Sequence, residues 1–306
     1  TRRRTWSPSC TGQHPGPSRR DRLDATLAFR RHVYSWGLGV ADAMDTAQRN
    51  MGLDAAATRE LIARSAEVAR EEGGSVVVGV NTDHVDAEHL TIDEVISAYL
   101  TQLEFTEEQG AGPVLMASRH LARVAEGAED YRRVYREVLQ RATTPVVLHW
   151  LGTAFDPQLQ GYFGADAWPA ASEMLLQIVK ENPGKVAGVK MSLLDAESEV
   201  AVRERLPEDV RMFTGDDFNY VGLIGGGDVP AAPQPQRDLR ARRQHSDALL
   251  GAFAALTPVA SAAIQALDAG DPARYLEILA PTEALSRQVS PRRHSITRPA
   301  SRSWRG

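Results

Sequence analysis

Lys190 is the residue of this sequence whose type most directly suggests chemistry. It lies near the end of the apolar segment KVAGVKMS, in a chain with three lysines, Lys180, Lys185 and Lys190, against 32 arginines. Arginine stays protonated, whereas a desolvated lysine can lose its proton and attack a carbonyl carbon to form a Schiff base. The residue type indicates imine chemistry; the alternative interpretation is a charge at a strand end that pairs with an acid.

Four further polar side chains follow apolar segments and could assist such a reaction. The imidazole of His149, with an ordinary pKa of ~6.5, suits proton transfer near neutral pH, unless it is a hydrogen-bonded histidine of the interior. Arg119 could pair with a carboxylate or phosphate, or form a structural ion pair. Asp216 and Asp217 could hold a substrate hydroxyl or the lysine ammonium, although at least one is expected to cap a helix. Three loop residues complete the candidates for the pocket: Thr46, Asp156 and Tyr162.

Metal chemistry is the rival interpretation of the same sequence. Hard ligands for a metal ion could come from His149, Asp83, His84, Asp216 and Asp45. No H-x-H or H-E-x-x-H spacing supports such a site, and the adjacent Asp83 and His84 converge only if their loop bends. We therefore predict no metal and no cofactor, and keep a metal-dependent barrel isomerase or aldolase as the alternative.

Short apolar segments alternate with longer amphipathic ones along the chain. A strand followed by a helix, repeated seven times, is typical of parallel βαβ units. The predicted strands cover residues 39–43, 75–80, 112–117, 145–151, 186–191, 210–214 and 248–253. The predicted helices cover residues 24–36, 54–72, 91–109, 130–141, 166–181, 195–205, 254–267 and 272–286, and TIDE at residues 91–94 has the form of a capping box.

The missing phosphate-binding motif separates the two architectures that fit this alternation. A doubly wound nucleotide-binding sheet opens with G-x-G-x-x-G after its first strand, and the chain has no such motif there. The pattern therefore favours a (β/α)8 TIM barrel of the α/β class. Because seven strands are recognisable, the predicted barrel lacks a regular first strand, and its last two helices are additional.

Charge divides the chain into three parts. Residues 1–22 and 288–306 each carry a net charge of +5, which leaves −15 for residues 23–287. We predict two basic, disordered tails around one barrel domain, with a mobile insertion at residues 225–247. The tails lack regularly spaced aromatic residues, so nucleic-acid binding is not expected. No segment is long and apolar enough to span a membrane, and the single Cys10 fits a reducing cytoplasm.

Several segments resemble the dihydrodipicolinate synthase/N-acetylneuraminate lyase superfamily. VAGVKMSLLD resembles the strand with the Schiff-base lysine, and FTGDDFNY resembles the Ser-Gly-Asp-Asp segment of the next strand end. The stretches VVLHWLG and FDPQLQGYFG are similar to an uncharacterised domain-of-unknown-function branch of dihydrodipicolinate synthase-like proteins. The resemblance covers residues 24–287 and implies a class I aldolase barrel, with an imine at Lys190 and a dimeric or tetrameric assembly.

The sequence also departs from that family at three places. The strand that should end in a proton-shuttling Tyr reads LMASRH, residues 45–48 replace the Thr-Thr-Gly-Glu loop that holds a keto-acid carboxylate, and Gly-Thr-Ala replaces Gly-Arg-Thr after residue 151. Pyruvate is therefore doubtful as substrate. We expect a lyase for a small hydroxylated oxo-acid or sugar-derived carbonyl compound, with His149, Tyr162 or water moving protons and with Asp216, Asp217, Arg119 and Thr46 positioning the substrate. A degenerate, non-catalytic barrel is the remaining alternative.

Overall fold

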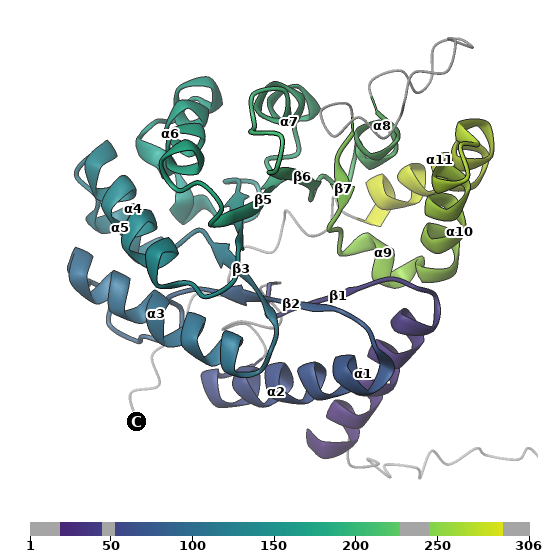
Figure 1. The fold of residues 1–306 in the computed structure, drawn as a ribbon, viewed down its shortest axis with the longest axis horizontal. Coiled ribbons are helices and arrows are strands. Elements are labelled where there is room, and N and C mark those ends of the chain that lie inside the picture. Colours follow the sequence, from purple (N-terminus) through teal and green to yellow (C-terminus); the bar gives the residue numbers. More distant parts are fainter. Residues whose placement is uncertain (1–18, 45–52, 227–244, 290–306) are drawn as a thin grey trace, which may run out of the picture.

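The computed structural model describes residues 19–44, 53–226 and 245–289. Seven parallel strands follow one another in chain order across one curled sheet, and the helices lie on its outer side (Figure 1). The strands are β1 (Val40–Asp42), β2 (Val76–Val80), β3 (Gly112–Met116), β4 (Val146–Leu151), β5 (Val186–Ser192), β6 (Arg211–Thr214) and β7 (Asp247–Ala248). The α/β class and the succession of parallel strands agree with the sequence pattern.

Among the described residues, helices follow each of the first six strands, one more helix precedes β1, and three follow β7. They are α1 (Arg19–Ser35), α2 (Ala55–Glu72), α3 (Ile92–Glu108), α4 (Arg119–Val124), α5 (Ala128–Arg141), α6 (Trp168–Glu181), α7 (Ala196–Arg203), α8 (Tyr220–Gly225), α9 (Ala252–Ala255), α10 (Thr257–Asp268) and α11 (Pro272–Val289). The capping box before α3 is present, because Thr91 accepts from the backbone N–H of Glu94 and the Glu94 carboxylate accepts from that of Thr91.

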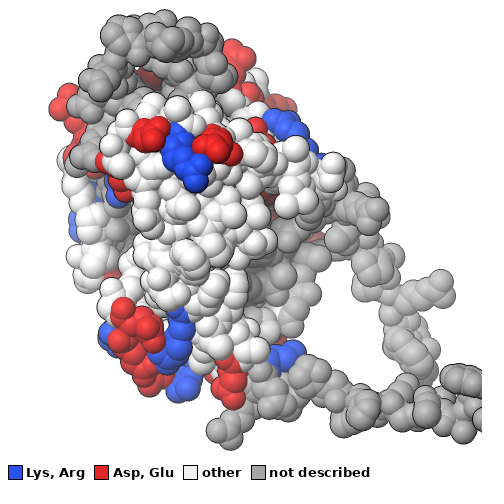
Figure 2. Space-filling view, turned by 90° about the vertical axis from the view of Figure 1, so that its right-hand side faces the viewer, with Lys and Arg blue, Asp and Glu red and all other residues white. Residues whose placement is uncertain are grey.

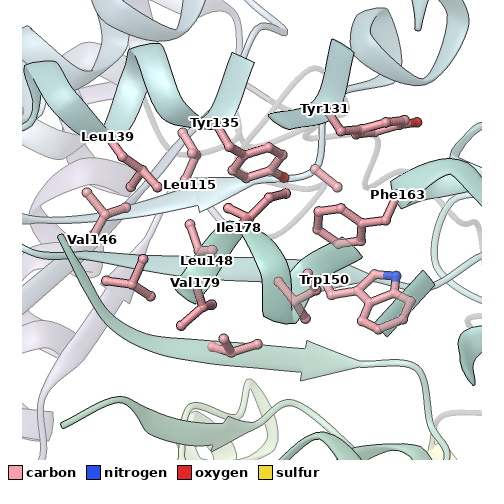
Figure 3. Packing of buried hydrophobic residues seen from close by; sticks show 14 of the residues in the cluster. Leu115, Tyr131, Tyr135, Leu139, Val146, Leu148, Trp150, Phe163, Ile178 and Val179 are labelled. Carbon is pink, nitrogen blue, oxygen red and sulfur yellow. The ribbon is translucent and has the colours of Figure 1, made fainter. Parts of the chain in front are cut away.

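The main core lies between the outer face of the strands and the helices. Val146 and Leu148 of β4 pack against Tyr135 and Leu139 of α5 and against Ile178 of α6 (Figure 3). All residues of β4 are buried because both faces of the strand are covered. A second, smaller cluster of Val114, Met116 and Val147 fills the inside of the curve.

The described sheet does not close through strand pairing, because β1 pairs only with β2 and β7 only with β6. Helices cover the gap instead. The hydroxyl of Ser261 in α10 donates to the backbone carbonyl of Trp36 at 2.6 Å, and Leu38 packs into the cluster that contains Tyr220 and Tyr275. The described fold is thus a seven-stranded, curled half-barrel, and the eighth strand of the predicted barrel is not confirmed.

Four local predictions differ from the structure. The last strand covers only Asp247–Ala248, and the end of the predicted segment 248–253 already belongs to α9. Arg119 begins helix α4, where a strand end was expected. Helix α1 begins at Arg19, inside the segment predicted as a tail. Helix α11 ends at Val289, two residues inside the other predicted tail. Residues 1–18 and 290–306 of the predicted tails, and residues 227–244 of the predicted insertion, lie outside the described residues.

The side of the molecule on which α10 and α11 lie is shown in Figure 2, where uncharged side chains make up most of the described surface. The charged groups on this side gather near its top and bottom. None of the helices in the described part of the chain has the length and apolar character that a membrane span requires.

Candidate active site

Four residues form one row across the inner face of the sheet. Strand register pairs Met116 with His149, His149 with Lys190, and Lys190 with Phe213. Met116 and Phe213 belong to the cluster inside the curve. Because paired residues of neighbouring parallel strands share a face, His149 and Lys190 also face the barrel interior.

The side chain of Lys190 runs toward the carboxyl end of the barrel. Its Cα is paired with that of Phe213, yet its Cε lies against Gly215, which is two residues farther along. A Cβ on Gly215 would be 2.8 Å from this Cε and 2.2 Å from the Oγ of Ser192. The absence of a side chain at Gly215 therefore makes the space for both groups, at the end of the barrel where active sites of this fold lie.

His149 connects Ser192 to the interior row. Its Nε2 lies 2.9 Å from the Oγ of Ser192, and its Nδ1 lies 3.1 Å from the Sδ of Met116. His149 and Ser192 are each 3% exposed. The lysine candidate and the histidine candidate from the sequence thus lie on one wall, and the histidine bonds to a serine that sequence reasoning did not select.

Asp216 organises the loop after β6. One of its oxygens accepts from the backbone N–H groups of Phe218 and Asn219, at 2.8 and 3.1 Å, and the other accepts from the Asn219 amide at 2.8 Å. These bonds use both carboxylate oxygens within the loop that precedes α8. The N-cap residue of α8 is Asn219, so Asp216 holds the loop and does not form the helix cap that was expected of one of these two acids. Asp217 lies beside it and is partly buried.

The bonding partners of Arg119 and Tyr162 do not include a residue of the row that contains Lys190. Arg119 Nε donates to Asp156 at 2.5 Å. Tyr162 lies in 3-10 helix η3 (Tyr162–Gly164) within the main core, where its hydroxyl accepts from the backbone N–H of Ser118 and bonds to the Tyr135 hydroxyl, both at 3.1 Å. Burial raises the pKa of the Tyr162 hydroxyl. Thr46 lies outside the described residues.

A buried acid behind β6 was not found by sequence reasoning. Glu199 of α7 accepts from the Ser246 hydroxyl at 2.7 Å, and the Arg203 guanidinium donates to the same hydroxyl at 3.1 Å. Burial raises the pKa of Glu199 to about 7, an effect that nearby Asp216 increases and hydrogen bonds from Ser246 and Thr214 reduce. A glutamate in an amphipathic helix carries no sequence signal for burial.

A second buried chain of hydroxyls was also missed. The Thr82 hydroxyl lies 2.7 Å from the Ser118 hydroxyl and 2.8 Å from Nδ1 of His120, whose Nε2 lies 2.9 Å from the Ala87 carbonyl. Because a carbonyl only accepts, Nε2 carries the proton and Nδ1 accepts from Thr82. The chain ties together the ends of β2 and β3.

The residues named for metal binding are engaged otherwise or lie apart. Asp83 is 3.9 Å from Arg119, and the pKa of His84 is lowered, mainly by burial. Within residues 19–44, 53–226 and 245–289, no three His, Cys, Asp or Glu side chains converge as metal ligands would. Asp45 lies outside these ranges.

A family model with the description "Protein of unknown function (DUF993)" matches residues 8–295. The chain belongs to the DUF993 family. This membership fits the domain-of-unknown-function branch to which the sequence is similar. No curated protein matches the chain.

Solved structures of the dihydrodipicolinate synthase family have the same fold as this DUF993 chain. The enzyme from Aquifex aeolicus has a TM-score of 0.62 at 13% identity, over 87% of this chain and 76% of that one. A Bacillus anthracis dihydrodipicolinate synthase has 0.61 at 13%, over 90% and 78%. A prophage protein of this family from E. coli K12, solved with pyruvate, has 0.59 at 13%, over 88% and 76%. Together with the family match, these findings confirm the resemblance deduced from the sequence.

Proposed function

We propose that the chain is a class I aldolase or lyase that forms an imine at Lys190 with a small hydroxylated oxo-acid or sugar-derived carbonyl compound. The supporting observation is the position of this lysine on the inner wall. Lys180 lies in α6 on the outside, and Lys185 donates to the Ala142 carbonyl at 2.8 Å before β5 begins. Of the three lysines, only Lys190 lies in a strand and faces the interior.

The reaction would use the neutral amine of Lys190. Its Nζ attacks the substrate carbonyl carbon, the carbonyl oxygen leaves as water, and the protonated C=N bond then withdraws electrons from the adjacent carbon. Cleavage of a C–C bond at this carbon leaves the electron pair there, as the C=C bond of an enamine. Loss of a C–H proton from this carbon gives the same kind of enamine, whose electrons can then expel an oxygen leaving group, with its electron pair, from the following carbon. Packing of Lys190 against Gly215 lowers the freedom of the side chain and so favours attack from one direction.

The remaining candidates would act around this centre. Asp217 and Thr46 are proposed to position substrate hydroxyls. Arg119 would bind a substrate carboxylate only by exchanging its bond with Asp156, and Tyr162 would act through the backbone it supports at Ser118. Asp216 would shape the loop. The E. coli relative with bound pyruvate supports an oxo-acid as one class of substrate to test.

Reductive trapping tests the imine. The chain is incubated with pyruvate or with dihydroxyacetone, reduced with borohydride, digested, and measured by mass spectrometry. We expect one adduct, on the peptide that contains Lys190, and none on peptides with Lys180 or Lys185. The Lys190→Arg variant should give no adduct, and Lys185→Arg is the matched control that should behave as the unchanged chain.

Two outcomes would contradict the proposal. An adduct distributed equally over the three lysines would show nonspecific amine chemistry. No adduct with any active substrate, together with loss of activity in a chelator, would favour the metal-dependent alternative.

Assembly and location stay predictions. The expected dimer or tetramer is measured by sedimentation of the purified chain, and location in the cytoplasm by fractionation of the source cells. A carbonyl compound is the one small-molecule partner that the proposal requires.

A further inference from the structure

The side chain next to Lys190 that the proposed reaction leaves unused is Ser192. The two residues are two positions apart on β5, so they share the inner face of the sheet. Both touch the space above Gly215, and their distances to a Cβ there place Ser192 Oγ within about 5 Å of Lys190 Cε, the sum of the two. A substrate carbon bonded to Nζ therefore lies within reach of this hydroxyl.

The direction of the Ser192 hydrogen bond follows from the partners of His149. The sulfur of Met116 lies 3.1 Å from Nδ1, and a thioether has no hydrogen to donate. Nδ1 therefore carries the imidazole hydrogen, and Nε2 presents its lone pair. The Ser192 hydroxyl donates to this lone pair over 2.9 Å, so a base is already in contact with its proton.

We propose that Ser192 is the proton-relay residue of the Lys190 site, with His149 as the base behind it and Met116 as the residue that sets the histidine tautomer. The proposal rests on the imine at Lys190. The relay would take the role of the tyrosine that moves protons in the family. This chain has no tyrosine at the corresponding strand end, where the sequence after Met116 reads Ala-Ser-Arg-His.

The proton transfer balances without another reactant. A C–H bond next to the protonated imine breaks, its proton passes to Ser192 Oγ, and the hydroxyl proton of Ser192 passes to His149 Nε2. The C–H electron pair forms the C=C bond of an enamine, and the C=N pair moves to Nζ, which becomes neutral. The reverse steps return the proton to the substrate carbon and restore neutral His149.

Burial suits a relay better than a direct base. His149 and Ser192 are each 3% exposed, whereas Lys190 is only partly buried. Water from the bulk is thus kept from the imidazole, and the serine hydroxyl is the part of the pair that lies next to the lysine. His149 would act through Ser192 as a positioning residue and proton acceptor.

Two measurements on the same full-length chain test the relay separately from the imine. Borohydride trapping reports imine formation at Lys190. Exchange of substrate C–H hydrogens for deuterium in D2O, followed by NMR with pyruvate and dihydroxyacetone as probes, reports proton transfer. For Ser192→Ala we expect an unchanged yield of adduct and exchange slowed about 100-fold or more, the size of a general acid–base contribution.

Matched variants keep the result interpretable. Ser172→Ala removes a buried hydroxyl of α6 that donates to the Pro169 carbonyl, and it should change neither measurement. His149→Gln keeps a hydrogen-bond acceptor but cannot take up a proton, so it should slow exchange as much as Ser192→Ala. Because the two residues act as one unit, the double variant should be no slower than either single variant.

Each outcome decides the proposal. Normal exchange in Ser192→Ala with a normal adduct would overturn the relay and leave the imine in place. No adduct on the unchanged chain with either probe would overturn the proposed function and the relay with it. If Ser192→Ala unfolds, His149→Gln is the deciding variant, since normal exchange in that variant also overturns the relay.

Discussion

The inner side of β5 and the outer side of β6 both hold a buried hydroxyl between two ionisable groups, but the groups face in opposite directions. On the inner side, Ser192 lies between His149 and the space occupied by Lys190. On the outer side, Ser246 lies between Glu199 and Arg203, under α7 and α8.

Both groups are buried, so burial alone does not tell which of them affects chemistry and which affects stability; the side of the sheet does. Helices cover the outer side of the sheet (Figure 1), so Glu199, Ser246 and Arg203 are enclosed between sheet and helix. The burial and hydrogen bonds of these groups therefore contribute to the free energy of unfolding. The inner side faces the barrel interior, where Lys190 is only partly buried, and this is the place at which the proposed imine would form. We expect changes on the inner side to alter chemistry, and changes on the outer side to alter the free energy of unfolding.

Lys190→Ala should give the largest effect on the inner side. Without an amine there is no imine, so trapping should fail, and turnover should fall by about five to six orders of magnitude, as for other covalent nucleophiles. The temperature of thermal unfolding should be unchanged or slightly higher, because a polar amine is removed from a partly buried place. A variant that unfolds at a clearly lower temperature but still forms the adduct would contradict the comparison, because Lys190 would then contribute to stability and not to the chemistry.

Gly215→Ala should lower both the stability of the inner wall and the rate of imine trapping at Lys190. The new Cβ would lie 2.2 Å from Ser192 Oγ and 3.0 Å from the Met191 carbonyl oxygen, so the strand end must shift. We expect a loss of about 1–3 kcal/mol in the free energy of unfolding and about 100-fold slower trapping. Gly222→Ala in α8, where a Cβ meets nothing within 4 Å, is the control and should be neutral or stabilising.

Glu199→Gln should change how stability depends on pH. The carboxyl has a pKa of about 7 when folded, above its ordinary value of 4.5, so the folded state holds the proton more tightly. The free energy of unfolding should fall as pH rises from about 4.5 to 7, by up to about 3 kcal/mol. Gln keeps the bond from Ser246 but does not titrate, so urea unfolding at pH 5 and pH 8 should show a smaller difference. An unchanged difference would assign the dependence to another group.

Thr82→Val should have the smallest effect of the four. The methyl group fills the place of the hydroxyl but leaves Ser118 and His120 without their shared partner, at a cost of about 1–3 kcal/mol. Thr82→Ser, which keeps the hydroxyl, is the control. Urea denaturation measures the cost; a loss of the Lys190 adduct in the valine variant would instead extend the active site to this group.

Strands and caps were predictable because their signals are local. The continuous apolar run of β4 and the capping box at Thr91 define an element within a few residues. The strand predicted for residues 248–253 was right at Ala248 but too long. The segment contains no β-branched residue, and a short apolar run of this kind also fits a helix. The start of α4 was missed although Ser118 caps it, accepting from the backbone N–H of Leu121.

The site was predictable only where residue type was distinctive. A strand lysine in an arginine-rich chain drew attention to Lys190, but serine is common, and Ser192 gains meaning only when strand register places His149 beside it. Glu199 became notable through the hydroxyl of Ser246, which is 47 residues away in the sequence. Contacts at such separation depend on the tertiary fold, which a pattern of neighbours does not contain.

Coverage of the gap between β1 and β7 by α10 and α11 has a consequence for the order of events during synthesis. The edges of these two strands meet no partner strand in the described sheet, and the Ser261–Trp36 bond links a late helix to the end of the first one. The earlier strands therefore leave the ribosome before the helices that protect their edges exist. Until residues 257–289 emerge, the nascent chain presents an open sheet edge. Holdase chaperones bind such an edge, and strands of other chains can pair with it.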